Sequence, residues 1–136
     1  MMIRLKDKNI SKNPIARAVA KKQLYSAMLD ARIHILMMEE GESAESTLAP
    51  IAEGIFVMAR AYELMDEMES VDYRKLRSAM LIFVECSENK FTWKQSYAIT
   101  VTNAIEICVD NWTRVPVKTL QLAIHEVTGK IKEVRR

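Results

Sequence analysis

Turn-forming residues are scarce in this chain, whose 136 residues include only three glycines and three prolines. All-β sandwiches and barrels need such residues at short intervals, so their scarcity argues against both architectures and favours long helices. No apolar run approaches the ~20 residues that a membrane-spanning helix needs. The basic start of the chain also lacks the apolar segment of a secretory signal. We therefore predict a helical protein that has no membrane span and resides in the cytoplasm.

Residues that commonly build catalytic and metal sites are also few. Neither histidine, His34 or His125, has a glutamate three residues earlier, the spacing that metal-binding helical bundles use. The two cysteines, Cys86 and Cys108, each lie inside an apolar helical pattern, which indicates buried core residues. Three isolated glycines form no phosphate-binding loop, and no serine-nucleophile motif is present. We therefore predict no catalytic residue, no metal and no cofactor, and an enzyme is the less favoured class.

The overall composition is typical of one folded domain. Hydrophobic residues make up 49% of the chain and charged residues 28%, which excludes a disordered or fibrous protein. A domain of this length buries about two thirds of its unfolded surface, enough for a substantial core. We predict an all-α fold, a compact bundle of four to five helices formed by residues 13–136. A flexible basic arm over residues 1–12 is expected to precede it.

Capping signals divide the first half of the chain into two helices. An Asn-Pro pair starts the first helix, which is predicted to cover residues 13–40 and to end where Gly41 supplies a left-handed turn. Ser46 or Thr47 is expected to cap a second helix, with Pro50 in its tolerant first turn. Both helices carry wide apolar stripes, so each should pack against other elements.

The second helix is predicted to end near residue 69 and to contribute a regular stripe to the core. Its apolar residues repeat at intervals of three and four: Leu48, Ile51, Ile55, Met58, Tyr62 and Met65. Gly54 in the same helix indicates a close approach to another helix.

The second half of the chain contains signals for three more helices. Ser70 is expected to cap a third helix that ends at a break over residues 87–90. Thr92 and Gln95 form a T-x-x-Q capping box that predicts a fourth helix. The alternation of β-branched residues over 97–109 leaves a strand as the alternative for that segment.

A fifth helix is predicted to open at Pro116, because proline suits the first position of a helix. Its apolar residues follow a heptad pattern, in which Gly129 is the interruption: Val117, Leu120, Ile124, Val127, Ile131 and Val134. Because fewer than three heptads are present, we expect this seam to pack on the bundle or on a second copy of the chain.

Charge is sorted along the chain. Residues 1–22 contain seven basic side chains and one acidic, residues 23–117 contain eight basic and fifteen acidic, and residues 118–136 contain five basic and two acidic. Complementary zones of this kind steer association between molecules. Together with the wide apolar stripes, they predict a homodimeric, non-enzymatic helical module that works by binding protein, in a process that the sequence does not identify.

Five residues are candidates for contact with a protein partner. Methionine side chains suit adaptable binding surfaces, and three of them fall near predicted helix ends, where exposure is common. Two glutamates represent the acidic face of the second helix. The candidate residues are Met37, Met38, Met68, Glu63 and Glu67.

The alternative function is nucleic-acid binding by an accessory protein through the basic N-terminal arm. Basic side chains neutralise phosphates without reading sequence, and an extended arm can follow a phosphate backbone. The absence of aromatic residues from the first 22 positions removes the usual means of stacking on bases, so this alternative is less favoured. Its candidate residues are Lys6, Lys8, Lys12, Arg17, Lys21 and Lys22.

Overall fold

A computed structural model describes the backbone of residues 14–135 and the side chains of residues 26–129. This part of the chain contains five α-helices and one short 3₁₀ helix, η1, in the order α2 (Pro14–Met37), α3 (Glu45–Leu64), α4 (Val71–Glu88), η1 (Gln95–Tyr97), α5 (Ala98–Asn111) and α6 (Val117–Arg135). The described residues contain no β-strand, only an isolated bridge between Ser43 and Thr92. The prediction of an all-α bundle of four to five helices is confirmed.

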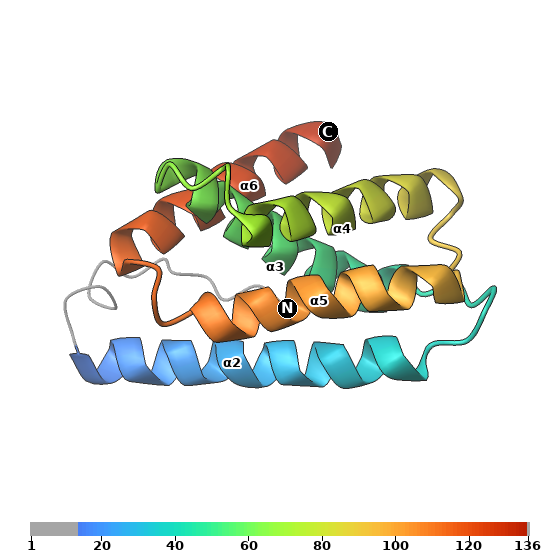
Figure 1. Ribbon diagram of the computed structural model, residues 1–136, viewed down its shortest axis with the longest axis horizontal. Coiled ribbons are helices and arrows are strands. Elements are labelled where there is room, and N and C mark those ends of the chain that lie inside the picture. The colour runs from blue at the N-terminus through green and yellow to red at the C-terminus, as the bar shows by residue number, and fades with distance from the viewer. Residues whose placement is uncertain (1–13, 136) are drawn as a thin grey trace.

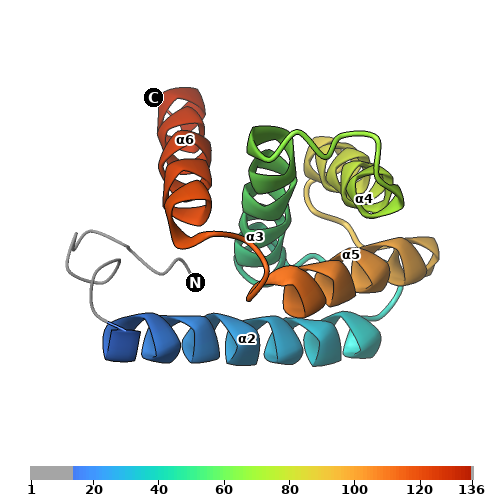
Figure 2. The same cartoon turned by 60° about the vertical axis from the view of Figure 1, so that its left-hand side comes forward.

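The helices form two layers. Helices α2 and α5 lie side by side and are antiparallel (Figure 1). Helices α6, α3 and α4 lie over them, with α3 between the other two (Figure 2). Helix α5 contacts α2, α3 and α4, whereas α2 packs chiefly on α5 and only slightly on α3. Much of the surface of α2 therefore faces away from the bundle.

The buried side chains form one core cluster between the layers. In α3, the predicted stripe is buried at Leu48, Ile51, Ile55, Met58 and Tyr62, and the last member of the stripe is partly buried. The three- and four-residue spacing keeps these side chains on one face of the helix, where they meet the other elements. The sequence prediction for this stripe is confirmed.

Helix α2 ends at Met37, three residues earlier than predicted. The side-chain amide of Gln95 donates a hydrogen bond to the Met38 carbonyl at 2.6 Å. This bond takes the place of the one that a backbone N–H would donate if the helix continued. Gly41 has a φ of +83°, which confirms the predicted left-handed position, although it lies in the following turn rather than at the helix end. Its N–H donates to the Trp93 carbonyl at 2.8 Å.

Two boundary predictions for α3 are wrong. The helix begins at Glu45 with Ala44 as N-cap and no side-chain cap bond, so Pro50 lies in the helix interior rather than the first turn. The helix also ends at Leu64 instead of near residue 69. The chain reverses there because Asp66 adopts a φ of +59°, which aspartate tolerates better than most residues, and the next N–H donates back to the Tyr62 carbonyl at 2.9 Å.

Gly54 meets α2 through a side chain and not through a close approach of the two helices, since α2 packs only slightly on α3. A Cβ atom built at Gly54 would lie 2.7 Å from the terminal methyl carbon of Met28, closer than real Cβ contacts. The glycine therefore leaves room for the Met28 side chain between the two helices.

The cap predicted for α4 is confirmed, and the capping box predicted for the fourth helix is wrong. The Ser70 hydroxyl accepts a hydrogen bond from the Tyr73 N–H at 3.1 Å. The Thr92 hydroxyl instead donates to the Asn89 carbonyl at 2.7 Å, and the side chain of Gln95 points to the end of α2. Residues 98–111 nevertheless form a helix, which decides between the helix and strand alternatives for this segment.

Helix α6 begins at Val117, one residue after the predicted start at Pro116, and packs on α3. Within its heptad seam, Leu120 and Val127 are buried, and Ile124 is partly buried against the core. The seam therefore packs within the bundle as far as residue 127. Its last two members lie beyond the described side chains.

The α2–α3 and α4–α5 loops are joined by backbone and side-chain hydrogen bonds. The Trp93 N–H donates to the Glu42 carbonyl at 2.8 Å, and the Ser43 hydroxyl donates to the Lys90 carbonyl at 3.1 Å. The Trp93 ring is fully buried and meets the Tyr97 ring edge to face, with 5.5 Å between ring centroids. This junction fixes the end of α2 relative to the start of α5.

Candidate interaction surface on helices α2 and α5

Helix α2 has two apolar faces, of which only one is buried. Met28 and Ile35 belong to the buried face that packs on the core. On the other side, Ile33 is 57% exposed, Leu36 63% and Met37 74%. These three residues follow one another at intervals of three and one, so they share a broad face of the helix away from the core. Exposed large side chains that cluster in this way are the usual mark of an interaction site.

Helix α5 adds one apolar side chain to this surface. Ile99 is 76% exposed, the highest value among the large apolar residues whose side chains the structure describes. An ion pair of 3.6 Å between Arg32 and Glu106 marks where α2 and α5 meet on their outer side. Ile99 lies two turns before Glu106 and Leu36 one turn after Arg32. Since the helices run in opposite directions, both residues lie on the same side of that ion pair. We call Ile33, Leu36, Met37 and Ile99 the outer patch.

The acidic residues at the end of α2 border the outer patch. Glu39 and Glu40 are exposed directly after the last turn of the helix. One carboxylate oxygen of Glu40 accepts a hydrogen bond from the Gln95 N–H at 2.9 Å, which fixes the side chain without neutralising its charge. One end of the patch is therefore negatively charged.

The three methionines predicted as contact residues differ in exposure and in location. Met37 belongs to the outer patch. Met38, one residue later, is only 4% exposed and packs in the core, so its prediction as a contact residue is wrong. The helix ends between the two residues, and the chain then turns Met38 inward. Met68 is 46% exposed, but it lies in the α3–α4 loop and belongs to the other layer of the bundle.

The two predicted acidic contacts are engaged within the protein. Glu63 accepts hydrogen bonds from Arg60 at 3.0 Å and from the Tyr73 hydroxyl at 2.6 Å. Glu67 accepts from the guanidinium of Arg114 at 3.1 and 3.2 Å. Burial raises the pKa of Glu63, but the hydrogen bonds from Tyr73 and Arg60 outweigh it, so its net pKa is lowered. These carboxylates stabilise the fold and do not form a free acidic face.

The same interactions join three helices into one polar network. Arg60 of α3 also pairs with Glu126 of α6. The Tyr73 hydroxyl, which belongs to α4, donates to Glu63 and so connects α4 to the same group. Arg114, ahead of α6, lies 5.3 Å from the centroid of the Tyr62 ring, a cation–π distance. We call the group formed by Arg60, Glu63, Tyr73 and Glu126 the polar network.

The residues of the nucleic-acid alternative fall largely outside the described part of the chain. Lys6, Lys8 and Lys12 precede the first described residue. Arg17 and residues 21–22 lie in α2, but their side chains are outside the described range. The alternative therefore stays a prediction.

Neither cysteine has the character of a nucleophile. Cys86 and Cys108 are both buried. Burial raises the pKa of both thiols, that of Cys108 to about 12, whereas a reactive cysteine needs a lowered pKa. Among the described residues, no group of three His, Cys, Asp or Glu side chains gathers as a metal site would require. No described helix is long and apolar enough to cross a membrane.

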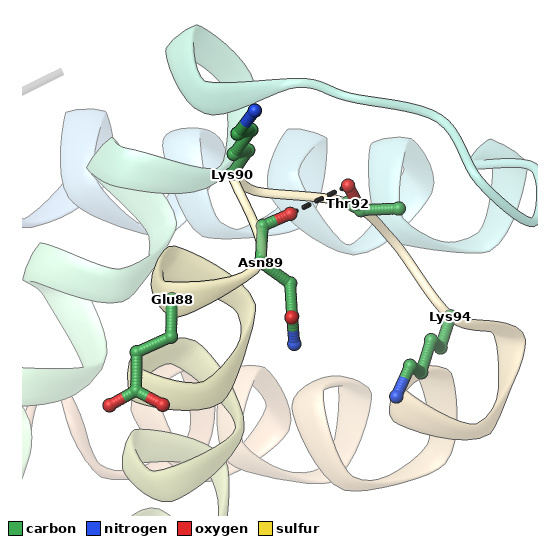
Figure 3. Close-up of a pocket in the computed structure, with 5 residues that line it drawn as sticks. All are labelled: Glu88, Asn89, Lys90, Thr92 and Lys94. Carbon is green, nitrogen blue, oxygen red and sulfur yellow. Dashed lines mark hydrogen bonds between the residues drawn. The ribbon is translucent and has the colours of Figure 1, made fainter.

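A shallow pocket lies where α4 meets the loop that precedes α5. It is lined by Glu88, Asn89, Lys90, Thr92 and Lys94, and the Thr92 hydroxyl closes one side by bonding the Asn89 carbonyl (Figure 3). Figure 3 shows that the charged groups of Glu88 and Lys90 point to opposite sides. Because all the charged lining residues are exposed and their side chains diverge, the pocket lacks the convergent groups of a ligand site.

The comparisons with known proteins give no further guide. No protein-family model, no curated protein and no solved structure matches this chain.

Three of the four outer-patch residues were not among the predicted contact residues. The sequence contains a signal for two of them, because Leu29, Ile33 and Leu36 form a second apolar stripe beside the buried one. A stripe of this width normally indicates burial on two sides. Ile99 carries no such signal, because its exposure depends on how α5 is rotated against α2.

Proposed function

We propose that this chain is a non-enzymatic protein-interaction module that acts as a homodimer in the cytoplasm. The observation that carries the proposal is the outer patch, whose four large apolar side chains are each more than half exposed. A second copy of the chain would remove this surface from water. Burial of a large apolar side chain is worth about 1.5–3 kcal/mol, which makes association the natural use of such a surface.

Chemistry is the less favoured use of this protein. Its thiols have raised pKa values, and Glu63, a carboxylate with a shifted pKa, is held by Tyr73 and Arg60 within the polar network. Groups engaged in this way are positioned to stabilise the fold rather than to exchange protons with a substrate. Nucleic-acid binding through the N-terminal arm is the competing proposal.

Light scattering coupled to size-exclusion chromatography tests the proposal. The purified chain, run with and without nuclease at low and high salt, should elute as a dimer that is free of nucleic acid and persists in high salt. Apolar contacts do not weaken with salt as charge contacts do, which gives this expectation. Leu36→Asp should produce a folded monomer, because it places a charge in the centre of the patch.

Leu81→Asp is the matched control, since Leu81 is 65% exposed on α4 and lies outside the patch. This variant should remain dimeric. A wild-type chain that is folded by circular dichroism and monomeric at every concentration would overturn the proposal. Nuclease-sensitive material that is lost in high salt would favour the N-terminal arm instead.

A further inference from the structure

The charges along α2 run against the dipole of the helix itself. The first half of the helix, residues 14–25, contains three basic residues and no acidic one: Arg17, Lys21 and Lys22. Residues 26–42, at its end and just beyond, contain four acidic residues and one basic one. A helix is stabilised by acidic residues at its start and basic residues at its end, so this order is unfavourable for α2 alone.

An antiparallel partner helix reverses that disadvantage. When two copies of α2 pack in opposite directions, the basic half of each lies beside the acidic end of the other. Parallel packing would instead place like charges together. The charge order of α2 therefore suits a neighbouring helix that runs the other way. Within the chain α5 is such a neighbour and pairs its Glu106 with Arg32, and a second α2 helix would be another on the outer face.

The apolar residues of the outer face give the register of such a pair. Positions 22, 26, 29, 33 and 36 follow one another at intervals of four and three within α2, the heptad spacing of helices that pack along their length. They are occupied by Lys22, Ser26, Leu29, Ile33 and Leu36, and the exposed Glu40 follows just beyond the end of the helix. The apolar residues occupy the middle of this seam, and residues of opposite charge stand at its two ends.

We propose that the outer face of α2 packs against the same face of a second copy, antiparallel about a two-fold axis level with residue 31. Leu29 of each copy then lies opposite Ile33 of the other, and Lys22 lies level with the exposed Glu40, just beyond the end of the partner helix. A two-fold axis makes each contact occur twice. The inference rests on the proposed function, because it specifies how the homodimer forms.

Several features of α2 fit this arrangement. The helix has 24 residues and is therefore about 36 Å long, more than three heptads. Its contacts with the rest of the chain are mainly with α5, so the opposite face is left for a partner. Ile99 flanks the seam near the end of α2, where the first half of the partner helix would cover it.

Charge reversal tests the register directly. Lys22→Glu places a carboxylate opposite Glu40 at both ends of the seam, and Glu40→Lys places two ammonium groups opposite each other. Each variant alone should have a dimer dissociation constant raised by about ten-fold or more, because like charges across an interface are repulsive. An equimolar mixture should form heterodimers, since both end contacts are then attractive. The combined variant K22E/E40K should regain dimerisation.

Native mass spectrometry of one unlabelled and one isotope-labelled variant measures the heterodimer fraction. Glu40→Gln keeps a side-chain oxygen for the Gln95 N–H, so it separates loss of charge from loss of that hydrogen bond. The matched control mixture is K90E with E88K, since both residues are exposed at the end of α4. This mixture should give the statistical half fraction of heterodimer.

The outcomes separate the two proposals. A wild-type dimer that gives a statistical mixture for K22E with E40K would overturn the antiparallel register and leave the homodimer standing. A wild-type chain that is monomeric would overturn both. A heterodimer fraction well above one half, together with recovery in K22E/E40K, would support the register.

Discussion

The layer of α3, α4 and α6 joins its helices through paired charged side chains, whereas the layer of α2 and α5 carries the outer patch at the place where its two helices meet. In the first layer, Arg60 binds Glu63 and Glu126, and Arg114 binds Glu67. In the second, Arg32 and Glu106 form an exposed ion pair beside the outer patch. Helix α4 of the first layer also exposes apolar side chains, Val71, Leu81 and Val84. The comparison therefore concerns the polar contacts: they join α3, α4 and α6 to one another, and the outer patch of the second layer is where we expect a partner.

The largest expected effect is at the junction that holds both layers. Trp93→Ala should lower the free energy of unfolding by about 3–5 kcal/mol, because it removes a fully buried ring from the contact between the two loops. Urea denaturation followed by circular dichroism measures this loss. Leu81→Ala, at an exposed position, should change stability by less than about 0.5 kcal/mol. Equal losses for the two variants would show that the junction does not hold the layers together.

The next effect is confined to the layer of α3, α4 and α6. Glu63→Gln should lower the free energy of unfolding at neutral pH by about 1–2 kcal/mol, since the carboxylate accepts charge-assisted hydrogen bonds from Arg60 and Tyr73. Urea titrations of this variant and of Glu69→Gln, at an exposed position, give the comparison. A loss from Glu69→Gln as large as that from Glu63→Gln would contradict a specific role of the polar network.

The pH dependence of the Glu63→Gln effect has a definite sign. The pKa of Glu63 is lowered in the folded chain, so the carboxylate contributes stability above its ordinary value of 4.5. That contribution is lost as the pH falls below 4.5 and then through the lower folded value. The difference between wild type and variant should therefore shrink in acid. A difference that grows on acidification would contradict the direction of the shift.

An effect of similar size is expected at the turn after α2. Gly41→Ala should cost about 1–2 kcal/mol, because Gly41 has a φ of +83° and a side chain is strained there even though the space around it is open. Thermal unfolding of G41A and of Gly129→Ala measures the contrast. Gly129 lies exposed within α6 without such a φ, so alanine there should stabilise the helix. Equal shifts of the same sign in the unfolding temperatures of the two variants would show that the left-handed backbone at Gly41 is not what disfavours alanine there.

Much of the fold could be predicted from the sequence because its helices carry strong periodicity. The stripe of α3 and the Ser70 cap of α4 depend on residues close in the chain, and the structure confirms both. The ends of α2 and α3 could not be predicted. The first depends on Gln95, more than fifty residues away in the sequence, and the second on a left-handed Asp66.

The candidate surface was predictable only in part, for the same physical reason. Met37 and Met38 are chemically identical and adjacent, and only the position of the helix end makes one exposed and the other buried. Glu63 and Glu67 look like a free acidic face in the sequence, but Tyr73 reaches Glu63 from α4 and Arg114 reaches Glu67 from the loop before α6, both by tertiary contact. Only the Arg60 partner of Glu63 is local, three residues earlier in α3. Local pattern gives the faces of a helix, and packing decides which of them is covered.

The smallest expected effect on the folded monomer is at the outer patch. Leu36→Ala should change the free energy of unfolding by less than about 0.5 kcal/mol when measured at a concentration below that of dimerisation, because the side chain is 63% exposed. At high concentration the same variant should lose stability relative to wild type, since a dimer is stabilised by mass action. Thermal unfolding across a hundred-fold range of concentration measures both regimes. A midpoint that is independent of concentration in the wild type would mean that the outer patch has no partner in a second copy.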